Sequence, residues 1–459
     1  MTAAPQPARY RADPVILELG DAFYDRVRAA DFPETTIRFR NDRAAAEVGL
    51  DLLDDTAWAR HFGRFEPLPD NLTEPLALRY HGHQFRVYNP DIGDGRGFLF
   101  AQLRDAHDRL MDLGTKGSGR TPWSRFGDGR LTLKGGVREV LATEMLEALG
   151  VDTSRSFSLI ETGEALERND EPSPTRSAVL VRLSHGHIRI GTFQRLAFMR
   201  DAEGLATLTR YVLRHYFNDD GAGDDAPLRL LSHVVNRTAR LAGQLMAAGF
   251  VHGVLNSDNI NVTGECFDYG PWRFTPNWDP GFVAAYFDHN GLYAFGRQPE
   301  AIHWDVMQLA GSLLPLAEEA ALIERLDAFG PAYQEAVTRA MLWRLGVVPR
   351  GLDADQALIQ AIERGMRATG IGIDDFYFHS FGGLLPAEWG EAFDEARVLL
   401  ASYTPRANRD HAYWRDPAPC SMLIDEVEAI WSAIAERDDW APFHAKIAAV
   451  RRMGHALAA

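Results

Sequence analysis

The amino-acid sequence predicts an α+β protein whose strands come first and whose helices come last. Short apolar runs bounded by turn residues lie between residues 98 and 193, as expected for strands. From Ala301 onward, the apolar residues recur with a helical period instead. The 459 residues, 46% of them hydrophobic, can build a core large enough for two or three lobes.

The composition excludes several classes of protein. A formal net charge of −16 argues against a general nucleic-acid binder, which needs a basic surface, and against binding to an anionic membrane. It does not exclude a nucleotide, because a pocket can be basic inside an acidic protein. Only two cysteines occur, Cys266 and Cys420, so the sequence predicts a cytoplasmic protein without a disulfide framework. Neither a membrane span nor a signal or transit peptide is expected, since no long apolar run occurs and MTAAPQPARYRADP lacks an apolar core.

The first part of the chain shows few regular patterns. Residues 1–80 are expected to form an irregular extension that wraps the body, with one short helix over Leu50–His61. The segment Tyr80–Pro90 follows and contains His81 and His83. Two histidines can bind a metal ion, but no third ligand is in view, so a structural role is favoured.

A glycine-rich turn introduces the predicted sheet. Gly93–Gly97 (GDGRG) precedes a strand over Phe98–Arg104, and a second strand over Arg109–Lys116 follows an Asp-Ala-His-Asp turn. Lys116 at the strand end can reach a phosphate as a point charge, or it can be solvated. The next loop, Gly117–Gly136, is rich in glycine and basic residues, and its backbone amides can form a nest for an anion.

A helix over Val137–Leu149 is expected after this loop. Its apolar residues recur at every fourth position, which predicts one buried stripe. Glu139 lies in the first turn of this helix. A lysine on a strand paired with a glutamate on the next helix holds phosphates in kinase-like folds, so Glu139 is a candidate partner of Lys116. Alternatively, Glu139 only complements the helix dipole.

Further strands are expected at Phe157–Glu161, Ala178–Leu183 and Ile188–Phe193, with a surface loop over Glu167–Arg176. Arg182 and Arg189 would then lie on flanking strands of one hairpin. Two guanidinium groups beside one turn can clamp a terminal phosphate, although they can equally pair with surface carboxylates.

The second half of the chain is predicted to be mainly helical. Helices are expected at Ala206–Phe217, Leu228–Ala248, His303–Ala317, Pro331–Gly346, Asp353–Thr369, Pro386–Ser402, Ile424–Glu436 and Pro442–His455. An acidic loop, Asn218–Asp225, separates the first two of these helices. The aromatic segment after Gly270 is expected to be a packed loop.

The segment His252–Gly270 carries the residues best suited to chemistry. Asn259 and Asp268, joined by alternating apolar residues, are predicted to meet at one end of a tight hairpin. An amide oxygen and a carboxylate placed there can share a Mg²⁺ or Mn²⁺ ion that bridges phosphates. Asp258 can accept a proton from a hydroxyl group. The alternative is an ordinary β-hairpin with Asx turns.

Five motifs follow one another along the chain. They are GDGRG (Gly93–Gly97), LGTKGSGRTPWSRFGDGR (Leu113–Arg130), REVLATE (Arg138–Glu144), HGVLNSDN (His252–Asn259) and FDYGPWRF (Phe267–Phe274). Together they resemble the selenoprotein O family, from about Tyr80 to Leu314. The resemblance implies an α+β, protein-kinase-like two-lobe fold. Its parts would be an N-terminal extension (1–80), a β-rich N-lobe (81–200), a helical C-lobe with the catalytic and metal loop (201–325) and extra C-terminal helices (326–459).

The resemblance also implies an activity and its residues. The family transfers AMP, rather than phosphate, from ATP to protein hydroxyl groups of Ser, Thr or Tyr. ATP, Mg²⁺ and protein acceptors are therefore expected, and a monomer is the working expectation. Matched to the family pattern, Gly93, Gly95, Arg96, Asp128 and Gly129 contact the nucleotide, Lys116 with Glu139 and the pair Arg182 and Arg189 bind phosphates, Asn259 and Asp268 bind Mg²⁺, and Asp258 accepts the proton.

One position departs from ordinary kinases. Small-molecule kinases of this fold carry His-Gly-Asp before the metal-binding asparagine, with Asp as the base, whereas this chain has Val254 after His252 and Gly253. The family resolves this departure with ATP bound in the reverse direction, so that the α-phosphate faces the acceptor. A conventional kinase with Asp258 as the base, UMP transfer and a catalytically silent ATP-binding scaffold are the alternatives.

A redox-active cysteine or selenocysteine near the C-terminus is common in the family. This chain ends in RRMGHALAA, so regulation through such a tail is not expected. Cys266 is predicted to be a buried hairpin residue and not a redox sensor.

Overall fold

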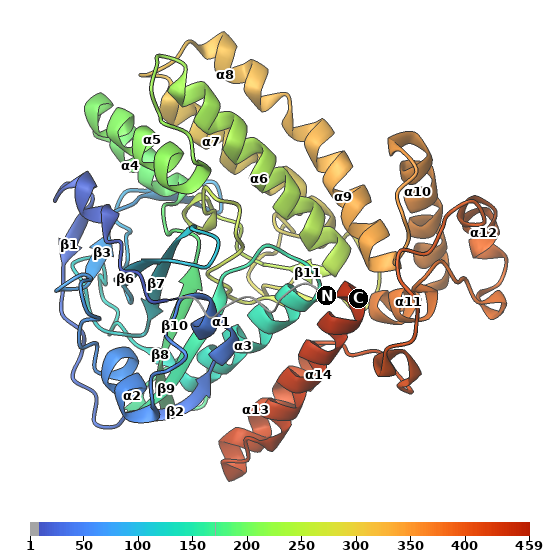
Figure 1. The fold of residues 1–459 in the computed structure, drawn as a ribbon, viewed down its shortest axis with the longest axis horizontal. Helices are drawn as coiled ribbons and strands as arrows, with labels where there is room; N and C mark the ends of the chain where they lie inside the picture. Colours follow the sequence, from blue (N-terminus) through green and yellow to red (C-terminus); the bar gives the residue numbers. More distant parts are fainter. Residues whose placement is uncertain (1–8, 170) are drawn as a thin grey trace.

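A computed structural model describes residues 9–169 and 171–459 of the chain (Figure 1). The first eight residues of the predicted extension, and Asp170 in the predicted surface loop, lie outside the described residues. The main sheet has eight strands, all antiparallel to their neighbours, in the order β1-β3-β6-β7-β10-β9-β2, with β8 paired to β10. The structure is therefore mixed α and β, as predicted.

The strands of this sheet are β1 (Tyr24–Arg26), β2 (Thr36–Arg40), β3 (Leu76–Leu78), β6 (Leu99–Arg104), β7 (Leu110–Lys116), β8 (Leu131–Thr132), β9 (Arg155–Leu166) and β10 (Thr175–Ser184). Two small two-stranded sheets pair β4 (Gly82–Gln84) with β5 (Val87–Asn89), and β11 (Phe250–Val251) with β12 (Arg273–Phe274).

The α-helices are α1 (Asp42–Glu47), α2 (Asp55–Gly63), α3 (Leu133–Ala148), α4 (Ile190–Phe198), α5 (Ala202–Phe217), α6 (Ala226–Ala248), α7 (Gln298–Leu313), α8 (Glu319–Leu326), α9 (Phe329–Leu345), α10 (Leu352–Thr369), α11 (Ile373–Ser380), α12 (Asp394–Leu400), α13 (Ile424–Arg437) and α14 (Ala441–Ala458). None of the helices in the described ranges has the length and apolar character needed to cross a bilayer.

The centre of the main sheet is buried on both faces. Along β10, Ala178 and Leu180 join the core that contains α3, whereas Val179 and Val181 join a second core with Trp58 of α2. Successive side chains of a strand point to opposite faces, so Arg182 must lie on the same face as Leu180. Strand β10 is therefore packed between two apolar cores, and Arg182 lies on the face that α3 covers.

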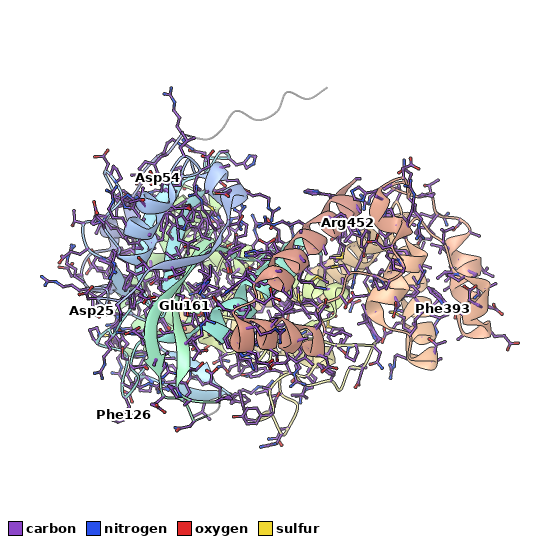
Figure 2. The ribbon with its side chains drawn as sticks, turned by 90° about the horizontal axis from the view of Figure 1, so that it is seen from below. Asp25, Asp54, Phe126, Glu161, Phe393 and Arg452 are labelled. Atoms are coloured by element: carbon purple, nitrogen blue, oxygen red, sulfur yellow. The ribbon has the colours of Figure 1, made fainter. Side chains whose placement is uncertain are left out.

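Helix α3 covers one face of the sheet. It begins at Leu133, not at Val137, because the Thr132 hydroxyl accepts a hydrogen bond from the Gly135 amide and caps the first turn. Helix α14 packs along α3, and α13 also contacts α3 (Figure 1). Figure 2 shows Phe126 at the sheet end of the molecule and Phe393 on the helices at the opposite end.

The long helix α6 organises the helical half. Pro227 lies in its first turn and Gly249 ends it with a φ of 70°, a left-handed conformation that glycine adopts without strain. Helices α7, α8 and α9 pack along α6. Their packing buries an apolar face of α6, including Leu231 and Leu245.

Several predicted elements are wrong. Ile188–Phe193 is not a strand, because Ile190, Phe193 and Leu196 face the core from helix α4; a short apolar run cannot distinguish the two structures. The predicted irregular extension contributes β1, β2 and β3 to the main sheet. Pro386–Ser402 is not one helix, since Gly390, with a φ of 72°, separates two short 3-10 turns before α12 begins.

The hairpin predicted between Asn259 and Asp268 does not form. Instead, Asn261 bridges to Arg189 and Cys266 bridges to Thr153, so this segment pairs with distant parts of the chain. Tertiary contacts of this kind leave no local pattern in the sequence. Cys266 is nevertheless buried, as predicted, and burial raises the pKa of its thiol to about 12.

Candidate active site

A cavity of about 840 Å³ opens between the main sheet and the segment that follows α6. Every residue predicted for the site lines it, except Glu139, which lies behind Lys116. The predicted lining residues are Gly93, Gly95, Arg96, Lys116, Asp128, Gly129, Arg182, Arg189, Asp258, Asn259 and Asp268. The fold therefore brings together residues that are far apart in the sequence.

The glycine-rich turn packs against the loop after β7. A Cβ atom at Gly93 would lie 2.6 Å from the Trp123 ring, and one at Gly95 would lie 2.9 Å from the Trp123 carbonyl oxygen. Gly129 has a φ of 71° and approaches the backbone of Gly119. These glycines allow two loops to lie close together and form one wall of the cavity.

Lys116 ends strand β7 and forms an ion pair with Glu139 of α3. Both side chains are buried. Burial lowers the pKa of the Lys116 ammonium, and the charge of Glu139 opposes this effect. The Lys116–Glu139 pair expected from the sequence is therefore present, and it fixes a cation at the base of the cavity.

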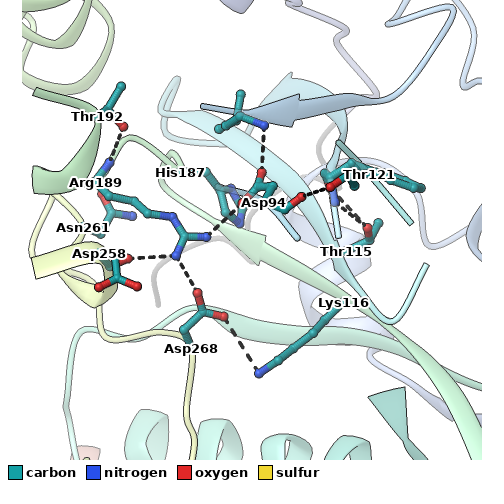
Figure 3. Close-up of polar contacts among 12 residues, drawn as sticks. Asp94, Thr115, Lys116, Thr121, His187, Arg189, Thr192, Asp258, Asn261 and Asp268 are labelled. Atoms are coloured by element: carbon teal, nitrogen blue, oxygen red, sulfur yellow. Dashed lines mark hydrogen bonds and ion pairs between the residues drawn. The ribbon is translucent and has the colours of Figure 1, made fainter. Parts of the chain in front are cut away.

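Asp268 binds the two arginines of the site. Its Oδ1 accepts a hydrogen bond of 2.6 Å from Arg182 Nη1. Its Oδ2 accepts one of 2.6 Å from Arg189 Nη1, which Figure 3 shows. Lys116 Nζ lies 3.8 Å from Oδ1. Burial would raise the pKa of the Asp268 carboxyl, but Arg182, Arg189 and Lys116 hold it well below its usual value.

We call Lys116, Glu139, Arg182, Arg189 and Asp268 the buried ionic cluster. Arg189 reaches it from the N-terminus of α4 and not from a strand, so the predicted hairpin of the two arginines is wrong although both arginines meet at one carboxylate. Its guanidinium group also stacks over the rings of Tyr80, at 4.4 Å, and Phe267, at 4.7 Å.

Asp94 is a residue of the site that the sequence did not reveal. Its Oδ1 lies 3.3 Å from Arg189 Nη2, and its Oδ2 accepts a hydrogen bond from the Leu78 amide. Burial raises the pKa of the Asp94 carboxyl, and the charge of Arg189 opposes this effect. The only signal in the sequence was its position inside the GDGRG motif. In that motif, the family resemblance assigns nucleotide contacts to Gly93, Gly95 and Arg96 and none to Asp94.

Several buried atoms of the cluster lack partners among the described residues. They are Nε of Arg182, Nε of Arg189 and Oε2 of Glu139. A buried donor without a partner is costly unless a ligand satisfies it. The unpaired guanidinium nitrogens therefore suit a site that receives further anionic oxygens.

Asp258 lies beside Arg189 of the cluster, in a short 3-10 turn over Ser257–Asn259. Its backbone carbonyl accepts a hydrogen bond of 2.9 Å from Arg189 Nη1. Its Oδ2 lies 3.4 Å from Gln84 Nε2, and its Oδ1 has no partner within the described ranges. Burial raises the pKa of the Asp258 carboxyl to about 6, against the opposing charge of Arg189.

Asn259 and Val254 lie close together. The Asn259 amide nitrogen donates a hydrogen bond of 2.9 Å to the Val254 carbonyl oxygen, which leaves Oδ1 as the atom able to bind a cation. Asn259 and Asp268 offer oxygen atoms only, the ligand type preferred by Mg²⁺. Two protein ligands are enough where phosphates and water complete the coordination shell, so these residues fit a nucleotide-bound Mg²⁺.

An exposed ion pair lies at the mouth of the cavity. Arg168 Nη1 lies 2.8 Å from Asp128 Oδ2, and these side chains are 22% and 48% exposed. Arg168, with Glu167 and Asn169, lines the cavity from the loop that the sequence predicts at the surface. Phe126 is fully exposed at the same rim.

Comparison with known proteins places this chain in a family. A family model described as protein adenylyltransferase SelO matches residues 8–416. The chain belongs to this SelO family. The family is one of nucleotidyltransferases, so the enzyme class expected from the sequence is confirmed.

Curated relatives support the same assignment. Protein nucleotidyltransferase YdiU of Gloeobacter violaceus is 43% identical over 96% of this chain and 95% of its own length. The YdiU protein of Synechocystis is 40% identical over 94% of this chain and 96% of its own length. That of Pseudomonas paraeruginosa is 36% identical over 78% of this chain and 73% of its own length. The match to SelO and YdiU proteins thus extends beyond the segment that carried the resemblance.

Proposed function

We propose that this chain is a Mg²⁺-dependent protein adenylyltransferase, which transfers AMP from ATP to Ser, Thr or Tyr hydroxyl groups of proteins and releases pyrophosphate. The observation that carries the proposal is the buried ionic cluster. Its three cations line the same cavity as Val254, which stands at the position of the kinase base. Deep cations suit the β- and γ-phosphates, which leave together in an AMP transfer.

The proposed reaction uses the buried ionic cluster and Asp258. The acceptor oxygen attacks the α-phosphorus, and the bond from this phosphorus to the α–β bridging oxygen breaks. Pyrophosphate takes the bonding electron pair, and Lys116, Arg182 and Arg189 stabilise its charge. The hydroxyl proton passes to Asp258, whose Oδ1 lacks a partner in the described parts of the chain.

Asn259 and Asp268 would hold the divalent cation. When bound, Mg²⁺ supplies positive charge that offsets the charge of the phosphates. Each carboxylate oxygen of Asp268 accepts one hydrogen bond from an arginine and keeps a lone pair with which it could bind the cation. Phosphate oxygens could bind the same arginines, because guanidinium groups bind carboxylates and phosphates in the same way.

A kinase-like division into two lobes is part of the proposal. Residues 81–200 would form the smaller, β-rich lobe and residues 201–325 the larger, helical lobe, with 1–80 and 326–459 as additions. The ion pair of Lys116 on β7 with Glu139 on α3 supports this division, since that pair is typical of kinase-like folds. We further propose a cytoplasmic location, because the chain has only two cysteines.

Two parallel labelling experiments test the proposal. The purified chain, with Mg²⁺ and a mixture of soluble proteins as acceptors, is incubated with ATP labelled at the α- or at the γ-phosphorus. Label is expected on protein from α-labelled ATP only, and it should be absent with Asp268→Ala or after chelation of the metal. α-Labelled UTP in the same assay tests UMP transfer.

The other outcomes separate the alternatives. Label from the γ-phosphorus only would show a kinase of conventional polarity and overturn the proposal. A lack of label from either position, while Mg²⁺-ATP still raises the melting temperature, would indicate an ATP-binding scaffold. Label from UTP in preference to ATP would replace AMP transfer by UMP transfer.

A further inference from the structure

The small hairpin β4–β5 carries the His81 and His83 motif, which the proposed reaction does not use. Its two turn residues, Phe85 and Arg86, have φ values of 50° and 63°. Two-residue hairpin turns of this kind usually contain Asn-Gly, because other residues rarely adopt positive φ. Such a conformation persists only where surrounding contacts hold it, and it is common near functional sites.

The contacts that hold the hairpin come from the residues directly before Asp258. The Phe85 amide donates a hydrogen bond of 3.0 Å to Asn256 Oδ1, which also accepts one of 2.7 Å from the Tyr293 hydroxyl. The His83 amide donates a hydrogen bond of 2.7 Å to the Ser257 hydroxyl. Two backbone amides of the hairpin are therefore tied to the loop that carries the proposed proton acceptor.

Gln194 of α4 completes this connection. Its Oε1 accepts a hydrogen bond of 2.6 Å from the Ser257 hydroxyl, and its Nε2 lies 2.7 Å from His83 Nδ1. His81 Nδ1 lies 2.8 Å from the Tyr88 hydroxyl. Each histidine thus has a hydrogen-bonding partner in the protein, which explains the motif without a metal ion.

The hairpin also touches the carboxyl group of Asp258 itself. Gln84 Nε2 lies 3.4 Å from Asp258 Oδ2, and the amide of Gln84 is oriented by Asn89, whose Nδ2 donates a hydrogen bond of 3.0 Å to Gln84 Oε1. On the other side, a Cβ atom at Gly82 would lie 2.7 Å from Asp258 Cβ and 2.8 Å from Oδ1. Any side chain at residue 82 would displace this carboxyl group.

We propose that the β4–β5 hairpin positions Asp258, with Gly82 and Gln84 as positioning residues. Gln84 donates to Oδ2, Oδ1 has no partner among the described residues, and the absence of a side chain at Gly82 leaves room for the carboxyl group. The strained turn is kept by Asn256, which joins hairpin and loop into one unit. This inference rests on the proposed role of Asp258.

The first test compares two glycine substitutions in the full chain. Gly82→Ala introduces a methyl group against Asp258, whereas Gly311→Ala in α7 introduces one with no atom within 4 Å; neither glycine has a positive φ. Transfer of α-label is expected to fall at least about tenfold in kcat with Gly82→Ala, because small displacements of a catalytic group are costly. KM for ATP and the ATP-induced rise in melting temperature should stay within about twofold of the parent values. Gly311→Ala should leave transfer unchanged.

A second variant tests the same proposal independently of whether Gly82→Ala folds. Gln84→Leu removes the amide but keeps a side chain of similar size, and it should lower kcat with little change in KM for ATP. Gln84→Asn retains an amide but shortens its reach, so its kcat should lie between those of the parent and Gln84→Leu. Normal kcat for both Gly82→Ala and Gln84→Leu would overturn the proposal, as would equal losses in kcat and in ATP binding.

Combination with Asp258→Ala shows whether the hairpin acts through this residue. In that background, Gly82→Ala and Gln84→Leu should cause no further loss of the residual transfer, because their common target is gone. A further loss of the same size would overturn the positioning role. If Asp258→Ala alone leaves transfer intact, the proposed role of Asp258 fails instead, so the two failures are distinguishable.

Discussion

Two groups of charged residues face the same cavity, and they differ mainly in burial. In the buried ionic cluster, the side chains of Arg182 and Asp268 are 4% and 18% exposed. At the mouth, the side chains of Arg168 and Asp128 are 22% and 48% exposed. Each group contains an arginine-carboxylate pair at hydrogen-bonding distance, so contact geometry alone does not distinguish them.

The difference in burial decides what each pair can do. A buried charge that loses its partner cannot recover the solvation it gave up, whereas an exposed charge is re-solvated at little cost. A phosphate that enters the buried cluster meets cations already stripped of water. At the mouth, water and salt screen the charges that the same phosphate meets. We therefore assign the strength of phosphate binding to the cluster and the entry of the nucleotide to the mouth.

The largest effect is expected for Asp268→Asn. Asparagine keeps the shape of the side chain and tolerates the φ of 56° at this position, so the change removes only the charge. Three buried cations then lack their shared anion, and unfolding free energy should fall by about 3–5 kcal/mol in urea titration. Protein labelling should fall at least about a hundredfold. Unchanged stability would show that the cluster is more hydrated than its burial indicates.

Removal of both charges of the buried Lys116–Glu139 pair tests the same cost of an unpaired buried charge. Lys116→Met leaves Glu139 buried without its cation and should destabilise the chain by roughly 2–4 kcal/mol, whereas Lys116→Met with Glu139→Gln should recover much of this loss. Transfer should stay low in both, because the phosphate-binding cation is gone. A double variant less stable than the single one would contradict the role of unpaired burial.

An ionic group outside the cavity should respond to acid. The side chains of Glu161, Arg38 and Arg176 are 13%, 20% and 29% exposed. Burial raises the pKa of the Glu161 carboxyl, but Arg176 and Arg38 together hold it below its usual value. Its contribution to stability is therefore present above the unfolded pKa and is lost as pH falls through the folded pKa. Urea midpoints from about pH 6 to about pH 3 should fall less steeply for Glu161→Gln than for the parent. Equal slopes would contradict the cause assigned to this pKa.

The smallest effect is expected at the mouth. Asp128→Asn removes an exposed ion pair with Arg168 and should change the unfolding free energy by no more than about 1 kcal/mol. KM for ATP should change by no more than a few-fold, and this change should shrink at high salt, because exposed charges are screened. A loss as large as that of Asp268→Asn would remove the distinction between the two groups.

Burial also predicts the behaviour of the cysteines. Cys266 is 3% exposed, and burial raises the pKa of its thiol to about 12, so it should resist alkylation in the folded chain at neutral pH and react after denaturation. Mass spectrometry after iodoacetamide treatment measures this difference. Rapid modification of Cys266 in the folded chain would reopen the question of a redox role.

The sequence alone determined the identity of the charged residues and the order of the main elements. Lys116 at a strand end and Glu139 on the next helix were predictable, because periodicity places both elements and the two charges are complementary. Asn259, Asp258 and Asp268 were recognisable from residue type and motif. Local sequence patterns thus identified the reactive residues, because a motif specifies the residue types that a reaction needs.

Only the tertiary structure decided how these groups meet. Arg189 reaches Asp268 from a helix that the apolar run had suggested to be a strand, and the segment from Asn259 to Asp268 pairs with distant chain instead of with itself. Asp94 and Gln84 entered the site through packing between segments that share no local pattern. The physical reason is that burial, and with it the strength of each charge, depends on residues remote in the sequence.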